Sequence, residues 1–502
     1  MERACSRTLG CLSYRLPAAG PIPRPRTNAL SFVVYNTLAR EKQEFRSLEA
    51  GRVRMYNCGP TVYGRQHIGN FRTFLFADIL RRWLEYLGYD VDQVMNITDV
   101  GHLVHDEDAG EDKIEAQAAR EKKDPFEISR QYTELFLQDA RDLGVCEPMA
   151  RPRATEFIPQ MVEMVQGLIE KGHAYQVGGD VYFDVTSFAR YGRLSGNRVD
   201  ELEPGARIAV HSDKRNPADF ALWKSDPKHL MKWETRFGPH GFPGWHIECS
   251  VMARALLGDR LDIHTGGEDN IFPHHECEIA QTEAFTGRAF ARYWMHSKFL
   301  QVDGGKMSKS LGNVYSLDEV RQKGFEPRQL RYCLIRGHYR APLNFTWEIM
   351  KESAAALANL DDLVVRLRKA ARGEGASPSA DDGLETVGEA KQEFENALND
   401  DLNTPRALAE LYKLRTLVLE GRLGQSAAAA ALQFVKKANE VLGVIQVEEE
   451  LLGADIQKLI DARQEARKKK DFKESDRIRD YLLGQGIVLE DTAQGVSWKK
   501  KG

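Results

Sequence analysis

Two short segments carry residue types that can bind the phosphates of a nucleotide. The run His-Ile-Gly-Asn at 67–70 starts a predicted helix, where free backbone amides and the helix dipole favour an anion. The run Lys-Met-Ser-Lys-Ser at 306–310 follows two glycines, so its ammonium groups can close on phosphates and stabilise charge on a leaving pyrophosphate. The candidate phosphate-binding residues of these runs are His67, Gly69, Asn70, Lys306, Ser308 and Lys309.

Cysteine, histidine and carboxylate residues form a second candidate site, and these residue types are natural ligands of zinc. Cys58 follows a predicted strand, Cys249 lies in the run WHIEC, and the run PHHECE contains His274 and Glu278. Since His274 and Glu278 are four residues apart, a helix would place them on one face. In an arbitrary protein, buried cysteines and a polar helix face would explain the same pattern. The competing ligands in the second run are His275, Glu276 and Cys277.

The elements around these residues predict a nucleotide-binding sheet. A short strand is expected at 53–56, and apolar residues recur from Phe71 to Leu87 at helical spacing, with Gly88 as the stop. A second strand is expected at 91–97. A strand, a helix and a strand in this order are typical of a parallel α/β sheet of Rossmann type.

The sequence changes character along the chain, and this predicts its domains. Residues 1–31 are expected to be a disordered extension, residues 32–330 a catalytic domain with an insertion around 120–230, and residues 331–385 helices with a linker. Residues 386–502 are expected to form a helical domain that ends in a small mixed segment. The extension is arginine-rich and resembles a transit peptide, but its prolines argue against an amphipathic helix.

Composition restricts the class of protein. A chain of 502 residues with 42% hydrophobic content is too long for one core, and its net charge of −4 limits nucleic-acid contacts to local basic patches. Seven widely spaced cysteines indicate a reducing compartment, and no uncharged apolar run approaches the roughly 20 residues of a membrane span. We expect a cytoplasmic protein, and an organelle matrix is the less favoured alternative.

The two phosphate-binding runs, in this order around an α/β core, resemble the ATP motifs of class I aminoacyl-tRNA synthetases. The second motif, KMSKS, is complete, whereas Asn70 stands where the first usually has histidine. An amide can donate a hydrogen bond to a phosphoryl oxygen but carries no positive charge. The runs YNCGPTVY, GWHIECS and GGEDNIFPHHECE are similar to the cysteinyl-tRNA synthetase family in particular, from about Phe32 to the C-terminus.

This resemblance implies roles for individual residues. The metal ligands would be Cys58, Cys249, His274 and Glu278, which would leave Cys277 outside the site. One zinc ion per chain would select cysteine by binding its thiolate, because a serine hydroxyl is a poor ligand for zinc. Magnesium would enter with ATP, and the expected partners are ATP, L-cysteine and tRNA(Cys), with a monomer as the default. The implied catalytic residues are His67, Asn70, Lys306 and Lys309, and these four would bind ATP together with Gly69, Gly267, Asp269 and Ser308. The implied cysteine-binding residues are Cys58, Thr61 and Trp245.

The C-terminal segment carries basic residues interleaved with aromatic ones, a pattern that suits phosphate contacts and base stacking. It resembles the end of bacterial cysteinyl-tRNA synthetases, where the anticodon is read. The candidate anticodon contacts are Arg467, Phe472, Asp476 and Asp491. Two alternatives stay open: a cysteine ligase acting on an amino sugar, which would lack this module, and a catalytically silent zinc- and RNA-binding protein.

Overall fold

The computed structural model describes residues 31–101, 112–197, 214–307, 312–374, 383–447, 454–485, 487–492 and 495–500. The chain forms two compact units, Met1–Ile445 and Gln446–Gly502. Nearly all of the expected N-terminal extension and the centre of the 306–310 loop lie outside the described residues. Among the described helices, none combines the length and apolarity needed to cross a membrane.

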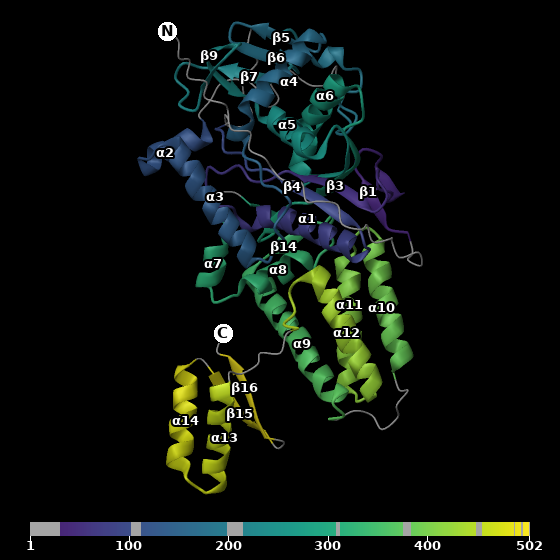
Figure 1. The fold of residues 1–502 in the computed structure, drawn as a ribbon, viewed down its shortest axis with the longest axis vertical. Coiled ribbons are helices and arrows are strands. Elements are labelled where there is room, and N and C mark those ends of the chain that lie inside the picture. Colours follow the sequence, from purple (N-terminus) through teal and green to yellow (C-terminus); the bar gives the residue numbers. More distant parts are fainter. Residues whose placement is uncertain are drawn as a thin grey trace, which may run out of the picture. The chain divides into compact units, whose positions relative to one another are not determined.

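A four-stranded parallel sheet forms the centre of the first unit, which confirms the predicted fold class (Figure 1). Its strand order is β11-β10-β3-β4. The direction in which the chain adds strands reverses between β10 and β3. From β3 the chain proceeds to β4 on one side, and from β10 it proceeds to β11 on the other. Ligands of such sheets bind beyond the carboxyl ends of the strands at this reversal. The strands are β3 (Arg52–Asn57), β4 (Asp90–Met95), β10 (Leu261–Gly267) and β11 (Ala291–Ser297).

Helix α1 (Ile68–Tyr86) connects β3 to β4 and includes the predicted apolar stripe as far as Leu84, while Leu87 is its C-cap residue. Phe71, Leu75 and Ile79 are buried along it, as the spacing indicates. On the other side of the reversal, α5 (Trp245–Leu257) precedes β10 and α6 (Glu276–Thr286) connects β10 to β11. An irregular turn at Ile271–His275, in which Phe272 has extended backbone angles, leads directly into α6.

An insertion separates the two halves of the parallel sheet. It contains helices and a five-stranded antiparallel sheet with the order β5-β6-β7-β9-β8. The helices are α2 (Lys113–Glu121), α3 (Pro125–Asp142) and α4 (Ile158–Glu170). The strands are β5 (Ala174–Val177), β6 (Asp180–Phe183), β7 (Phe220–Ser225), β8 (Trp233–Thr235) and β9 (Gly238–Pro243).

Small strands and long helices complete the first unit. An antiparallel hairpin precedes the parallel sheet, and a three-stranded sheet of order β13-β12-β14 follows it. Helices α9 to α12 then run side by side as a bundle (Figure 1). These strands are β1 (Val33–Asn36), β2 (Glu41–Glu44), β12 (Leu300–Val302), β13 (Gly305–Lys306) and β14 (Leu343–Phe345). The helices are α7 (Leu317–Gln322), α8 (Pro327–Ile335), α9 (Trp347–Ala371), α10 (Leu384–Asn399), α11 (Thr404–Leu419) and α12 (Gln425–Leu442).

The second unit has its own core. Helices α13 (Ala454–Lys468) and α14 (Phe472–Gly484) pack on the hairpin of β15 (Ile487–Thr492) and β16 (Gly495–Lys500). Ile460, Ile478, Leu482 and Ile487 are buried between them. Residues 386–502, which the sequence suggested as one domain, are thus divided between the bundle and this unit.

Candidate active site and metal centre

The first predicted ATP motif lies against residues in and just after the second. The amide of Ile68, in the first motif, donates to the carbonyl oxygen of Tyr315 at 2.9 Å. A Cβ atom built on Gly69 would lie 3.4 Å from the terminal methyl carbon of Met307, the second residue of the KMSKS loop. Glycine at 69 therefore allows the loop to approach the first turn of α1 closely.

Asn70 has a structural role that the sequence did not reveal. Its side-chain Oδ1 accepts from the amide of His67 at 3.1 Å, and its own amide donates to Nδ1 of His67 at 3.2 Å. The two residues therefore form a reciprocal cap at the start of α1. Since Nδ1 of His67 accepts a hydrogen bond, Nε2 carries the hydrogen of the neutral ring and acts as the donor.

The four residues expected to bind metal come together although they lie up to 220 positions apart. Ligand atoms of Cys58, Cys249, His274 and Glu278 all lie within 4.8 Å of one another. Nε2 of His274 lies 3.1 Å from Oε1 of Glu278, as their spacing on one helix face predicts. Cys58 follows the end of β3, and its amide donates to Thr265 of the adjacent β10 at 3.1 Å.

The electrostatics of this cluster suit a cation. Burial raises the pKa of the Cys58 thiol well above its ordinary value, and the hydrogen bond to Cys249 raises it further. Burial also acts to raise the pKa of Cys249, but hydrogen bonds with Cys58 and His274 lower it to about 7. Burial likewise opposes ionisation of Glu278, yet His264 and His274 lower its pKa to about 2. Burial lowers the pKa of His274, but Glu278 and the hydrogen bond with Cys249 raise it to about 10, so an imidazolium is the positive partner of these anions in this structure. A metal cation bound here would take over that role.

Three histidines outside this set contact three of its members, and the sequence reasoning singled out His275 among them only as a competing ligand. Nδ1 of His246 lies 2.9 Å from Nδ1 of His274, and Nε2 of His264 lies 2.9 Å from Oε2 of Glu278. His275 lies 3.2 Å from the Cys58 sulfur through Nε2 and 2.8 Å from His296 through Nδ1. Polar partners of this kind fix the orientation of metal ligands. A single histidine in an apolar strand, such as His264 in LDIHTGG, is a weak local signal.

The described residues contain two further groups of potential metal ligands. Cys58, His264, His275 and Glu278 also have ligand atoms within 4.8 Å, so this set shares two members with the first. The first set supplies two sulfur ligands and the second only one, and soft thiolates favour zinc. The third group lies away from the sheet reversal and consists of Asp112, Glu115 and His229.

Among the predicted substrate contacts outside the ligand set, Trp245 borders the candidate metal cluster. The ring of half-buried Trp245 lies 4.7 Å from the His274 ring, between centroids. Thr61 forms an isolated β-bridge with Thr98. The hydroxyl of Thr98 donates to Glu248 at 2.8 Å, and Glu248 precedes Cys249 in the sequence. Gly267 ends β10, and Asp269 is exposed in the turn that follows.

The remaining predicted residues are in the second unit or have side chains that the structure does not describe. Lys306 is in β13, but its side chain is not described, and Ser308 and Lys309 lie outside the described residues. In the second unit, Arg467 is at the end of α13, while Phe472 and Asp476 are on α14. Asp491 lies in β15, and its side chain is outside the described part.

Comparison with known proteins assigns the chain to a class. Residues 44–355 match the family described as tRNA synthetases class I (C) catalytic domain. A methionyl-tRNA synthetase of Mycobacterium tuberculosis bound to methionyl-adenylate shares the fold with a TM-score of 0.60 at 14% identity, over 78% of this chain and 92% of that one. The fold and the paired ATP motifs therefore define a class I aminoacyl-tRNA synthetase.

The other matches are more specific. Residues 393–446 match the DALR domain, and residues 449–498 match the cysteinyl-tRNA ligase anticodon binding domain. The cysteine–tRNA ligase of Chlorobaculum tepidum is 44% identical over 94% of this chain and 99% of that protein. The enzyme of the same name from Thermus thermophilus is 42% identical over 94% and 99%. The chain belongs to the cysteine–tRNA ligase family of enzymes.

Proposed function

We propose that this enzyme uses ATP to convert L-cysteine to cysteinyl-adenylate and transfers the cysteinyl group to tRNA(Cys), with a zinc ion selecting cysteine. The observation that carries the proposal is the convergence of two thiols, an imidazole and a carboxylate within 4.8 Å of one another. The match of residues 449–498 supports the tRNA partner and argues against an amino-sugar ligase without such a module.

The zinc ion would be held by Cys58, Cys249, His274 and Glu278, one ion per chain. When bound, it would accept the thiolate of cysteine and discriminate against the harder hydroxyl of serine. Pocket size alone distinguishes substrates that differ by one methylene-sized group by only about 10- to 200-fold. The adjacent Trp245 ring would close the small pocket around the cysteine side chain.

The chain's own groups would stabilise the charges of the first step. In this step the cysteine carboxylate attacks the α-phosphate of ATP, and pyrophosphate leaves with magnesium. Nε2 of His67 and the side-chain nitrogen Nδ2 of Asn70 would donate to phosphoryl oxygens from the start of α1. Lys309 would make the central lysine contact with ATP and Lys306 would assist, while Gly267 and Asp269 would lie near the ribose.

The 3′-terminal adenosine of the tRNA would then take the acyl group. Arg467, Phe472, Asp476 and Asp491 remain our candidates for contacts with the anticodon. We further propose that the enzyme acts as a monomer in the cytoplasm, as the bacterial-type sequence and the family's reaction in protein synthesis suggest.

The deciding experiment is cysteine-dependent exchange of pyrophosphate into ATP, with serine as the alternative substrate and with zinc removed and restored. We expect exchange with cysteine only, its loss without zinc, and its return when zinc is added. Exchange that persists in zinc-free protein would overturn the metal-based selection.

Two cysteine variants test the choice of ligands. C249S should lose zinc and cysteine activation together, because a hydroxyl replaces one thiolate ligand. C277S is the matched control, since Cys277 is also buried and lies next to Glu278 but outside the proposed ligand set. Zinc retained at one equivalent by C249S would contradict this ligand set and direct attention to the two sets without Cys249, which are Cys58, His264, His275 and Glu278, and Asp112, Glu115 and His229.

A further inference from the structure

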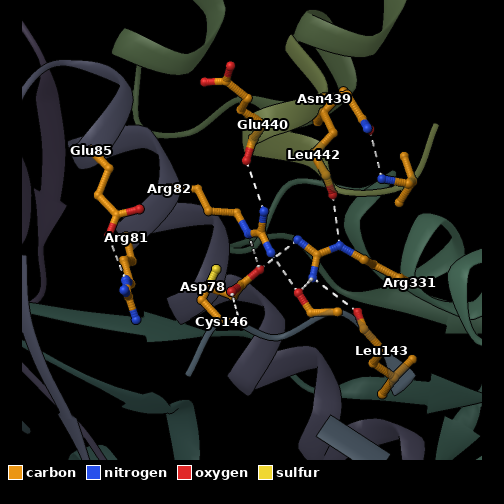
Figure 2. Close-up of polar contacts among 12 residues, drawn as sticks. Asp78, Arg81, Arg82, Glu85, Leu143, Cys146, Arg331, Asn439, Glu440 and Leu442 are labelled. Carbon is orange, nitrogen blue, oxygen red and sulfur yellow. Dashed lines mark hydrogen bonds and ion pairs between the residues drawn. The ribbon is translucent and has the colours of Figure 1, made fainter. Parts of the chain in front are cut away.

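A fully buried arginine, Arg331 on α8, lies where three other helices meet (Figure 2). Its Nη2 donates to Oδ2 of Asp78 on α1 at 2.6 Å. Its Nε donates to the carbonyl of Leu442 at 2.8 Å, and its Nη1 donates to those of Leu143 and Gly144 at 3.1 Å each. One guanidinium group thus joins α1, the end of α3 and the end of α12.

A second arginine strengthens the same junction. Arg82 donates to Asp78 at 2.7 Å, to the carbonyl of Gly144 at 2.6 Å and to that of Glu440 at 2.9 Å (Figure 2). Both guanidinium groups therefore lie at the carbonyl ends of α3 and α12, where helix dipoles favour a cation. Although burial opposes ionisation, the two arginines lower the pKa of Asp78 below its ordinary value.

Arg331 lies in close contact with the residue that follows α12. A Cβ atom on Gly443 would lie 3.1 Å from Nη2 of Arg331, and Gly443 has a φ of 65°, so glycine is favoured here twice over. Asn439 accepts from the amides of Val444 and Ile445 at 2.9 and 2.8 Å, so the chain leaving α12 is also held (Figure 2). The second compact unit begins at the next residue, Gln446.

Helix α1 begins at the predicted ATP motif. Asp78 lies 11 residues after His67 on the continuous helix, a distance of about 16 Å at 1.5 Å per residue. The first turn is held separately, because the amide of Ile68 donates to Tyr315. Helix α1 therefore connects the ATP site to the helix from which the chain enters the C-terminal unit.

Stability alone explains this buried ion pair poorly. Desolvating two charges offsets most of their attraction, and apolar residues of similar volume often stabilise a core as well. A buried, multiply bonded arginine does impose one particular arrangement of its neighbours, and here these neighbours are the ends of three helices.

We propose that Arg331 is a positioning residue for tRNA charging. Through Asp78 it holds the ATP-site helix α1 in register with the end of α12. Binding of tRNA by the C-terminal unit thereby orients the active-site groups for acyl transfer. This inference rests on the proposed function, because it requires that the C-terminal unit binds the anticodon. The first step without tRNA does not need the junction, since Tyr315 holds the start of α1 directly.

The test compares R331K with R328K in the full-length, zinc-loaded enzyme. Lysine at 331 keeps the charge but cannot contact four groups at once. Arg328 is a control on the same helix: it pairs with Asp361 of α9 at 2.7 Å and donates to the carbonyl of Val444 at 3.5 Å, but it does not bind Asp78, so it isolates the link to α1. Pyrophosphate exchange without tRNA measures the first step, and kcat is measured for charging of tRNA(Cys) and of a tRNA with an altered anticodon.

For R331K we expect charging of tRNA(Cys) to fall about tenfold in kcat, toward the rate of the altered tRNA, with exchange within about twofold of the parent enzyme. R328K should leave both rates within about twofold. Equal losses in exchange and charging, or an unchanged preference for the intact anticodon, would overturn the proposal. Failure of the parent enzyme to perform exchange would instead refute the proposed function.

A second variant provides for the case that R331K does not fold. D78N keeps an acceptor for the amide of Cys146, which donates to Asp78 at 2.7 Å, and removes only the charge. It should reproduce the selective loss in charging, and the R331K/D78N double variant should be no worse than either single variant, because all three break the same contact. Additive losses in the double variant would count against a shared route.

Discussion

Nε2 of His264 lies 2.9 Å from Oε2 of Glu278, while Nε2 of His274 lies 3.1 Å from the other carboxylate oxygen. The carboxylate is therefore held from two elements, since His264 is in β10 and His274 is in the turn before α6. His264 fixes the oxygen that faces away from His274, and this arrangement leaves Oε1 directed at the candidate metal ligands.

Replacing His264 by phenylalanine should weaken zinc binding roughly 10- to 100-fold, because loss of an outer hydrogen-bond partner frees a metal-ligating carboxylate to turn. Phenylalanine is chosen because the His264 ring stacks 4.6 Å from Trp294, so an aromatic ring keeps the packing. Zinc affinity is measured by competition with a chelator. H264Q, which retains a donor, should lose less, and equal zinc affinity in H264F and the parent would exclude this role.

Removing the Asn70 side chain should impair the first step of the reaction. N70A loses the cap on His67 and a potential donor to phosphate, and loss of one such donor typically costs roughly 10²-fold in kcat. N70H should retain most of the activity, because a histidine ring can accept from the amide of His67 and still donate through its other nitrogen. The measurement is cysteine-dependent pyrophosphate exchange at saturating ATP. A fully active N70A would show that neither the cap nor the donor matters.

Sequence patterns predicted those parts of the structure that depend on local periodicity. The apolar spacing after Phe71 predicts α1, and the alternation of strands with helices predicts the parallel sheet, because each pattern reports one buried face. The ATP motif is located from the same information, since it lies where a strand leads into a helix. The choice of His274 and Glu278 over their neighbours came from family resemblance, because spacing alone also allows His275 and Cys277.

Other features depend on contacts between distant residues and have no local signal. Asp78 and Arg331 are 253 positions apart, and each looks like an ordinary charged residue on an amphipathic helix. The group of His246, His264 and His275 is assembled from α5, β10 and the turn before α6, so only the folded chain reveals it. The division after Ile445 was equally hidden, because helical sequence continues on both sides of it.

Stability near neutral pH should improve when Asp99 is replaced by asparagine. Burial is the main cause that raises the pKa of Asp99 from 3.8 to about 6, although it accepts from both the amide and the hydroxyl of Thr155. Because the folded state favours the protonated form, ionisation of Asp99 lowers the free energy of unfolding. This loss of stability is absent below about pH 4 and complete above about pH 6. Two pKa units correspond to roughly 3 kcal/mol, as an upper estimate.

The D99N variant should therefore gain stability relative to the parent as pH rises from 4 to 7. Thermal unfolding of both proteins across this range provides the comparison, with zinc present throughout. Asparagine keeps one acceptor and gains one donor, so both contacts with Thr155 can form. A stability difference that does not change with pH would show that Asp99 titrates normally in the folded protein.

Phe472 should contribute to tRNA binding through base stacking. It is the first residue of α14 and is 63% exposed, which is unusual for a phenylalanine in a unit that has its own buried core. An exposed aromatic ring among basic side chains suits a splayed-out base, and stacking of this kind is worth about 1–3 kcal/mol per base. F472A should therefore weaken tRNA binding by at least about fivefold while leaving pyrophosphate exchange unchanged. The control is L483A on the same helix, because Leu483 is also an exposed apolar residue, at 45%, but has no aromatic face. Equal losses of tRNA affinity in the two variants would show that general apolar contact, and not stacking, is what α14 provides.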